Sequence, residues 1–410
     1  MAVSTVTNVS PVDVVREAGF ILGNKLQFLK SGIPDYSSRF KNGSSGQTVK
    51  IAKPTKVSIS TGTWDVSSVP NADREGSVDL TMSRTPITVP HIFTDDQRTL
   101  DFQDMKSQII APSISRLAAA IESQVLSDTM YKIGTFGQAA TLTDDAVSTI
   151  RQKMIDNLVD ESNLKALIRS SMTKDLRGDT KGLFNAASAI GEQNLSGGIN
   201  RWGGFDFMEG TILPVQTTGT RTATGGGTVS TTMTEGALTV ALDIGAASNT
   251  VVAGEIFYIA ACEAVNDQTK VSLGAPYPFT VAEAATASSG IVTVTLTANV
   301  YASGSDNRQN VTRLPTSGDV ITWVGAASST IQQGLFYDPR AFATAFADLP
   351  VDDEANGAIT TVPGTKIRLR FERQKNSITG QTVYRWDVLM ASAMVEPAFA
   401  ARFFRTASTT

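Results

Sequence analysis

The chain has 410 residues, of which 41% are hydrophobic and 18% charged, and a net charge of −4. This length exceeds the ~250 to 300 residues at which single cores stop growing, so we expect at least two cores. The hydrophobic content excludes a largely disordered chain, and the acidic balance argues against a dedicated nucleic-acid binder, whose affinity rests on clustered Lys and Arg.

Charge is unevenly distributed along the chain. Residues 1–60 hold eight Lys and Arg against three acids, residues 365–405 repeat that balance, and residues 215–335 hold four bases against eight acids. Two interpretations stay open: basic segments of one copy meet acidic surfaces of another, or all of these are solvated surfaces. The N-terminus lacks a signal-peptide pattern and no segment approaches ~20 continuous apolar residues, so we expect a soluble, cytoplasmically made protein.

An amphipathic helix is predicted for residues 11–29, where apolar side chains recur at helical spacing. Gly19 and Gly23 weaken it by about 1 kcal/mol each relative to Ala, so it needs a packing partner, for which a neighbouring subunit is a candidate. Asp13 and Glu17 lie at i, i+4 on one face. They either receive a basic partner or belong to an ordinary exposed face.

An extended two-stranded loop follows. Residues 48–51 and 78–82 alternate like strands, and a long Thr- and Ser-rich passage containing Trp64 and Asp65 lies between them. An unsupported hairpin is only marginally stable in water. We therefore expect this loop to rest on something outside the subunit.

Two helices are predicted next. The first follows Pro112 and carries one apolar stripe up to Gly134. The second covers residues 144–158, with Thr143 or Asp144 as its N-cap. A strand at residues 164–168, a helical turn at 172–177 and a Gly-rich loop at 178–204 then follow in the sequence.

The composition changes abruptly at residues 217–232, which are rich in Thr, Gly and Ser and contain Gly225-Gly-Gly227. Such a stretch predicts a flexible domain boundary. From about 236 to 333, short apolar runs alternate with turn residues, as expected of a small β-barrel or sandwich. Beyond it, we expect a helix at 339–346 and a strand at 367–371 paired with 383–388.

The sequence contains few candidates for catalytic or metal-binding residues. The single histidine, His91, supplies one potential base and excludes multi-histidine metal sites, and a structural histidine is favoured. Asp95 and Asp96 could coordinate a cation or share a proton, but they are better explained as the cap of a helix start. Cys262, in an apolar run, is interpreted as a small buried hydrophobe. We expect no catalytic residue, no cofactor and no metal.

Taken together, the helical arm, the two-stranded loop, the long helix after Pro112, the capped helix at 144 and the closing strands resemble the tailed-bacteriophage major capsid protein of the Hong Kong 97 fold. The segment Gly204-Phe-Asp-Phe-Met-Glu-Gly-Thr-Ile-Leu-Pro-Val-Gln-Thr-Thr is similar to the lead-in to the inserted β-barrel of Lederbergvirus-like short-tailed phage coat proteins. The resemblance implies an α+β capsid fold with an all-β insertion domain.

The resemblance also implies a division of the chain. Its parts are an N-terminal arm (1–46), an extended loop (47–92), a peripheral domain with the spine helix (93–140), an axial domain (141–221), the β-barrel insertion domain (222–335) and a return through the axial and peripheral domains (336–410).

The implied function is self-assembly, as pentamers and hexamers, into the icosahedral shell of a virion that encloses double-stranded DNA. Implied partners are a scaffolding protein, a portal at one vertex, non-specific contact with the packaged DNA and, as a further candidate, a decoration protein; synthesis is expected in the host cytoplasm, with no membrane partner. Asp13 and Glu17 are candidate contacts for scaffolding protein, and Trp64 and Asp65 are candidate contacts between subunits.

Three other hypotheses remain. An encapsulin-like cellular compartment would use the same fold to hold enzyme cargo, and the inserted domain counts against it. A β-rich adhesin or glycan-binding protein would explain the Thr-, Ser- and Gly-rich centre, but an export signal is missing. An enzyme that uses His91 is the least supported hypothesis.

Overall fold

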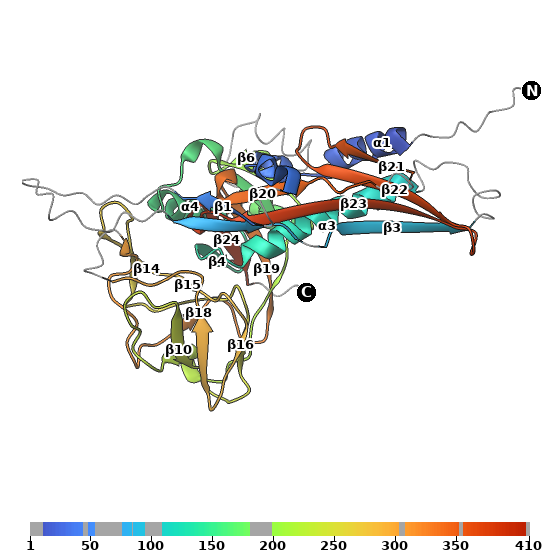
Figure 1. Cartoon of the computed structure of the whole chain (residues 1–410). Coiled ribbons are helices and arrows are strands. Elements are labelled where there is room, and N and C mark those ends of the chain that lie inside the picture. Colours follow the sequence, from blue (N-terminus) through green and yellow to red (C-terminus); the bar gives the residue numbers. More distant parts are fainter. Residues whose placement is uncertain are drawn as a thin grey trace, which may run out of the picture. The chain divides into compact units, whose positions relative to one another are not determined.

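The computed structural model describes residues 11–43, 48–53, 76–83, 85–94, 109–180, 199–302, 308–351 and 356–406. The chain forms two compact units, and Figure 1 colours it from the N-terminus to the C-terminus. Unit 1 comprises residues 1–51, 79–125 and 342–393, and unit 2 comprises residues 52–78, 126–341 and 394–410. Each unit is therefore built from segments far apart in the sequence.

Unit 1 contains a five-stranded sheet in the order β20-β23-β22-β21, with β3 also paired to β23. Its strands are β3 (Ile87–Thr94), β20 (Phe342–Ala347), β21 (Asn356–Thr361), β22 (Arg368–Asn376) and β23 (Gln381–Met394). Strands β22 and β23 are antiparallel, with Phe371 opposite Trp386 and both side chains buried. The pairing predicted between residues 367–371 and 383–388 is confirmed.

The helix predicted at residues 339–346 is wrong. Only Pro339–Ala341 form a short 3-10 turn, and the residues after them are strand β20. The sequence Phe-Ala-Thr-Ala-Phe-Ala is buried at nearly every position. Such a run has no periodicity that distinguishes a buried strand from a buried helix, and here the long-range pairing with β23 decides.

A cluster of four charged side chains lies on the sheet of unit 1, of which Asp387 and Arg370 are buried and Glu372 and Arg385 are partly exposed. The carboxylate of Asp387 is fully buried and accepts hydrogen bonds from Arg370 Nε at 3.0 Å and from Thr88 Oγ1 at 2.7 Å. Arg385 Nε lies 2.9 Å from the same carboxylate, and Glu372 Oε1 lies 3.0 Å from Arg370. Each buried charge thus has an opposite charge beside it, as burial requires.

Helix α1 (Pro11–Lys25) packs on strands β21 and β22 of its own chain. The two glycines of the predicted helix face these strands. A Cβ on Gly19 would lie 3.2 Å from Thr360 Cγ2, and a Cβ on Gly23 would lie 3.0 Å from the Pro363 oxygen. The glycines that weaken the isolated helix therefore permit its close packing, and the packing partner lies in the same chain rather than in a neighbouring subunit.

Strands β1 (Thr48–Ala52) and β2 (Ser77–Thr81) form a two-stranded sheet. The Lys53 amide donates to the Gly76 oxygen at 2.7 Å and extends the pairing by one step. These are the strands predicted at 48–51 and 78–82, and they are confirmed. The passage between them, residues 54–75, lies outside the described residues.

Unit 2 contains a seven-stranded mixed sheet in the order β4-β24-β19-β5-β7-β6, with β8 paired to β19. Its strands are β4 (Phe136–Ala139), β5 (Lys165–Ile168), β6 (Arg201–Trp202), β7 (Phe205–Glu209), β8 (Gln216–Thr217), β19 (Thr330–Tyr337) and β24 (Ala400–Arg405). The pairs β24–β4 and β5–β7 are parallel. The strand predicted at 164–168 is confirmed as β5.

The predicted helices are confirmed with adjusted ends. Helix α3 (Ala111–Met130) follows the expected apolar stripe, and helix α5 (Ser170–Thr180) is longer than the predicted turn. Helix α4 (Asp144–Asp156) is N-capped by Thr143, whose Oγ1 accepts a hydrogen bond from the Ala146 amide at 3.3 Å. Among the described residues, no helix is both long and apolar enough to cross a membrane.

The β-rich segment of unit 2, residues 228–323, confirms the short strands predicted from about 236 to 333. Its strands are β9 (Thr228–Val229), β10 (Thr239–Asp243), β11 (Thr250–Val251), β12 (Ile256–Tyr258), β13 (Glu263–Val265), β14 (Ser272–Pro276), β15 (Phe279–Thr280), β16 (Ala285–Thr286), β17 (Ile291–Thr295) and β18 (Thr322–Trp323). They pair as β17-β10-β9, β11-β16, β15-β12-β18 and β13-β14. One apolar core, which includes Phe257, Phe279 and Trp323, lies among them.

The flexible linker predicted at Gly225-Gly-Gly227 is wrong, whereas a domain boundary near these residues stays a prediction. All three glycines have positive φ, at 69°, 97° and 106°. A Cβ on Gly227 would lie 2.2 Å from the Asp243 oxygen, and the Gly226 oxygen accepts a hydrogen bond from Trp323 Nε1 at 2.8 Å. The glycines are there because the turn needs left-handed backbone and close backbone approach, and the result is a packed turn.

Candidate assembly surfaces

The outer face of α1 is a mixed apolar and charged surface of unit 1. Val12 and Phe20 are each 52% exposed, and Asp13 and Arg16 lie exposed on the same helix. Glu17 is half-buried one turn after Asp13. Exposed aromatic and aliphatic groups beside charges are typical of protein-binding surfaces. The structure thus brings the predicted pair, Asp13 and Glu17, to one helix in unit 1.

The position of this helix depends on Glu122 of α3. Its Oε1 accepts hydrogen bonds from the amides of Gln27 at 2.8 Å and Leu29 at 3.2 Å, just after α1 ends. Burial raises the pKa of Glu122 above its ordinary value, although these amides act in the opposite direction. Sequence reasoning missed Glu122, whose signal was one acid between Ile121 and Val125 on the apolar stripe.

The other two predicted contacts, Trp64 and Asp65, lie outside the described residues. Beside that passage, Lys53 Nζ forms an ion pair with Glu396 Oε2 at 3.4 Å. Both side chains are partly exposed, so the pair contributes less than about 1 kcal/mol. The ion pair nevertheless gives the residue after β1 a contact within unit 2. This end of the loop is therefore held in part by its own chain.

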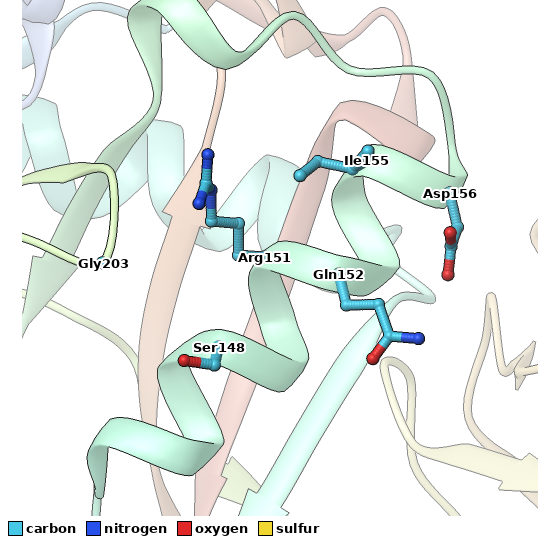
Figure 2. Close-up of a pocket in the computed structure, with 6 residues that line it drawn as sticks. All are labelled: Ser148, Arg151, Gln152, Ile155, Asp156 and Gly203. Carbon is cyan, nitrogen blue, oxygen red and sulfur yellow. The ribbon is translucent and has the colours of Figure 1, made fainter.

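A shallow pocket of about 320 Å³ lies along α4 in unit 2 (Figure 2). Figure 2 shows helix side chains on one side and a glycine turn on the other: Ser148, Arg151, Gln152, Ile155, Asp156 and Gly203. Gly203 has φ of 54°, and a Cβ there would lie 2.8 Å from Val147 Cγ1. Arg151 pairs with Glu161 at 2.5 Å. This mixed, open lining suits a surface contact rather than catalysis.

A second pocket of about 460 Å³ lies in unit 1. Lys30, Lys366 and Asp35 line it together with the apolar side chains of Ile33 and Phe346. Two lysines against one aspartate make the local charge positive. That charge favours an acidic group of a partner over a basic one.

The β-rich segment presents a row of outward side chains across adjacent strands. Ile291 lies opposite Asp243, Asp243 opposite Thr228, and Thr228 opposite Val320. Directly opposed residues of antiparallel strands point to the same face of a sheet. Because Ile291 and Val320 are 43% and 61% exposed, this row has apolar side chains at both ends.

The described residues contain no catalytic or metal centre. No group of three or more His, Cys, Asp or Glu side chains within these ranges could hold a metal ion. His91 is half-buried on β3, opposite Tyr384, and its ring lies 4.3 Å from that of Phe93. Cys262 is fully buried, and burial raises its pKa to about 11. Asp95 and Asp96 lie outside the described residues.

Comparison with known families identifies the kind of protein to which these surfaces belong. The family model described as "P22 coat protein - gene protein 5" matches residues 34–404, nearly the whole chain. The chain belongs to this family. The coat protein is accordingly a bacteriophage major capsid protein that builds a shell and becomes part of the virion, and it is not an enzyme. Its α+β fold is the tailed-phage capsid fold.

Several solved structures are similar to the coat protein. One from Mycobacterium phage Che8 is 11% identical, with a TM-score of 0.46 and 93% of each chain covered. The capsid of cyanophage P-SCSP1u is 11% identical, with a TM-score of 0.45, and covers 89% of this chain and 85% of its own. The virus-like particle from Pyrococcus furiosus is 7% identical, with a TM-score of 0.40, and covers 95% and 97%. No curated protein sequence matches the chain.

The family match also orders the competing hypotheses. A phage shell is favoured over an encapsulin-like compartment and over an adhesin or glycan-binding protein. An enzyme based on His91 is set aside, because the family is structural. Self-assembly into an oligomeric shell is therefore the activity of this chain.

Proposed function

We propose that the coat protein has the Hong Kong 97 fold in its Lederbergvirus-like form, and that its copies form the pentamers and hexamers of an icosahedral shell around double-stranded DNA. The family match over residues 34–404 supports the shell, and the observation that carries the Lederbergvirus-like form is the pairing of β8 with β19 at Thr217 and Thr330. The chain leaves the mixed sheet after β8, builds a separate apolar core, and returns to the same place. A β-rich segment with this connection is an insertion into the subunit.

The proposal includes the division of the chain into capsid parts. These are the N-terminal arm (1–46), the extended loop (47–92), the peripheral domain (93–140), the axial domain (141–221), the insertion domain (222–335) and the returning segment (336–410). The apolar core of residues 229–323 supports the fifth of these parts, because it is made entirely within that range.

We further propose that shell formation needs a scaffolding protein that binds the outer face of α1 through Asp13 and Glu17. The exposure of Val12 and Phe20 beside this acidic pair supports a protein partner with basic and apolar groups. A portal at one vertex, a decoration protein and weak contact with packaged DNA are further proposed partners. Synthesis in the host cytoplasm is part of the same proposal.

The test is co-expression with the scaffolding protein, followed by electron microscopy and sedimentation. Closed shells of uniform size are expected. The double variant Asp13→Asn/Glu17→Gln should weaken binding to scaffolding protein by about tenfold or more, which is ~1.4 kcal/mol. The matched control, Asp145→Asn/Glu209→Gln, removes two exposed acids of unit 2.

Each part of the proposal has its own contrary result. Only small oligomers from the wild-type protein and its scaffolding partner would reject the shell. Equal binding by the two double variants would reject the α1 contact alone and leave the shell in place.

A further inference from the structure

Arg402 is a fully buried arginine in the mixed sheet of unit 2. It lies on β24 within Ala400–Arg405, where the neighbouring side chains of Phe403 and Phe404 are apolar and buried. Among the described residues, no carboxylate pairs with its guanidinium. Burial accordingly lowers the pKa of Arg402 to about 9. A cation held away from water without a counter-ion is costly, so its contacts are informative.

The guanidinium donates to four acceptors. Its Nε donates to the Ile133 oxygen at 3.0 Å, and Nη2 donates to the Gly254 oxygen at 2.8 Å. Its Nη1 reaches Gln216 Oε1 at 3.4 Å and Gln333 Oε1 at 3.3 Å. These are the loop after α3, a turn of the insertion domain, and the two strands by which the chain enters and leaves that domain.

The turn that carries Gly254 is also held from its other side. The carboxylate of Glu255, next in the chain, accepts hydrogen bonds from the Val252 amide at 2.6 Å and the Gly219 amide at 3.1 Å, and pairs with buried Arg221. Arg221 in turn lies over the Trp323 ring, 4.3 Å from its centroid. Glu255 therefore ties the turn to Gly219 and Arg221, which precede the insertion domain, and through Arg221 to Trp323 of its core.

The backbone at the contact requires glycine. Gly254 has φ of 82°, and a Cβ there would lie 2.9 Å from Gln216 Oε1 and 3.0 Å from Tyr131 Cβ. The amide of Gln216 donates to the Ala253 oxygen at 3.2 Å while its oxygen accepts from Arg402. Side chain, turn and strand thus form one connected polar network at the junction.

We propose that Arg402 is a lock that fixes the insertion domain in one orientation on the mixed sheet, and that this orientation is needed for correct shell geometry. The planar guanidinium is suited to this because its donors diverge in fixed directions and can bind four segments at once. An apolar residue would fill the space but would leave these carbonyl and amide oxygens without donors. The proposal rests on the insertion domain and the shell proposed above.

The test compares Arg402→Gln with Arg405→Gln on the same strand. The guanidinium of Arg405 pairs with Asp175, outside the insertion domain, at 2.7 Å. The backbone of Arg405, which the substitution keeps, pairs with Gln332 of β19. Hydrogen exchange is measured on the unassembled full-length subunit, which keeps the result independent of shell formation. In Arg402→Gln, exchange of residues 252–257 and 279–281 should accelerate by about tenfold or more, while residues 239–243 in the domain core stay protected. Arg405→Gln should leave all three segments unchanged.

Two further variants keep the test decisive if Arg402→Gln does not fold. Gly254→Ala keeps the carbonyl that accepts from Arg402, but its Cβ would lie 2.9 Å from Gln216 Oε1 and 3.0 Å from Tyr131 Cβ, so the turn must move away from Arg402. It should therefore give the same exchange pattern. Arg402→Lys keeps the positive charge but lacks the planar guanidinium with its diverging donors, and should give an intermediate acceleration of hydrogen exchange. With scaffolding protein, Arg402→Gln or Gly254→Ala should yield shells of mixed size. Unchanged exchange at residues 252–257 in these variants overturns the lock, and uniform shells despite faster exchange overturn its link to shell geometry.

Discussion

The insertion domain and the sheet of unit 1 bury their side chains in different ways. The insertion-domain core is apolar, with Phe257 between Phe279 and Trp323 at ring-centroid distances of 5.2 and 5.0 Å. The sheet of unit 1 buries the ion pair of Asp387 and Arg370 among its apolar side chains. The buried pair of Glu255 and Arg221 lies at the entry to the insertion domain and is not part of its apolar core. Hydrophobic burial is non-directional, whereas a buried ion pair offsets the loss of hydration only when its geometry is good. The first region should therefore depend on packing volume and the second on charge.

The largest effect is expected from Phe257→Ala in the apolar core. Removing the ring leaves a cavity between two aromatic partners and should cost about 4 kcal/mol. The unfolding transition of the insertion domain in urea, followed by tryptophan fluorescence, measures it. Ile291→Ala, an exposed position in the same domain, should stay within about 0.5 kcal/mol. Similar losses of unfolding free energy for both variants would show that the apolar core is not what stabilises the domain.

The next effect is expected from Asp387→Asn in the sheet of unit 1. Loss of the carboxylate charge leaves Arg370 and Arg385 without their shared counter-ion. The free energy of unfolding should therefore fall by about 3 kcal/mol. The exposed pair of Asp348 with Arg368 provides the control, and Asp348→Asn should cost less than about 1 kcal/mol. Denaturant unfolding of the two variants measures the difference. A loss for Asp387→Asn no larger than that of the control would mean that the buried cluster is replaceable.

A smaller effect, which depends on pH, is expected at Glu122. Because burial raises its pKa in the folded state, the folded chain binds the proton more tightly than the unfolded chain does. Stability contributed by this group is present at low pH and is lost as the pH rises through the folded pKa. Wild type should therefore lose stability relative to Glu122→Gln as the pH is raised from 4 to 7. A relative gain over that window would contradict the assignment.

The last prediction concerns the reactivity of the Cys262 thiol in the insertion-domain core. With a pKa of about 11, its thiol is almost wholly protonated at pH 8. Alkylation in the folded protein should be at least about a hundredfold slower than in the urea-unfolded chain. Mass spectrometry of iodoacetamide-treated protein follows it. Equal rates would mean that this part of the core opens readily.

The fold could be predicted from sequence where the pattern is local, and could not where distant contacts decide the structure. The apolar strands of the insertion domain and the stripe of α3 repeat with a regular period, so local pattern was sufficient. The run Phe342–Ala347 has no such period, and its strand state comes from pairing with β23. Gly225-Gly-Gly227 has the composition of a linker, but contacts with distant residues make it a packed turn.

The candidate surfaces were predictable only where charge and spacing were local. Asp13 and Glu17 are one helical turn apart, so their common element could be expected. Glu122 and Arg402 could not be assigned, because their partners lie 93 and 95 residues away in one case and up to 269 residues away in the other. The sequence shows each of them only as a single charged residue within an apolar run. The partners of that charge can be identified only from the folded structure.

The most direct test of the account is a single-particle reconstruction of the particles that the coat protein forms with its scaffolding partner. We predict a closed icosahedral shell in which every subunit carries the core of residues 229–323 as a separate lobe, joined to the mixed sheet at Arg402. Filaments, open sheets or free subunits under the same conditions would contradict the claim that this chain is a shell-building coat protein.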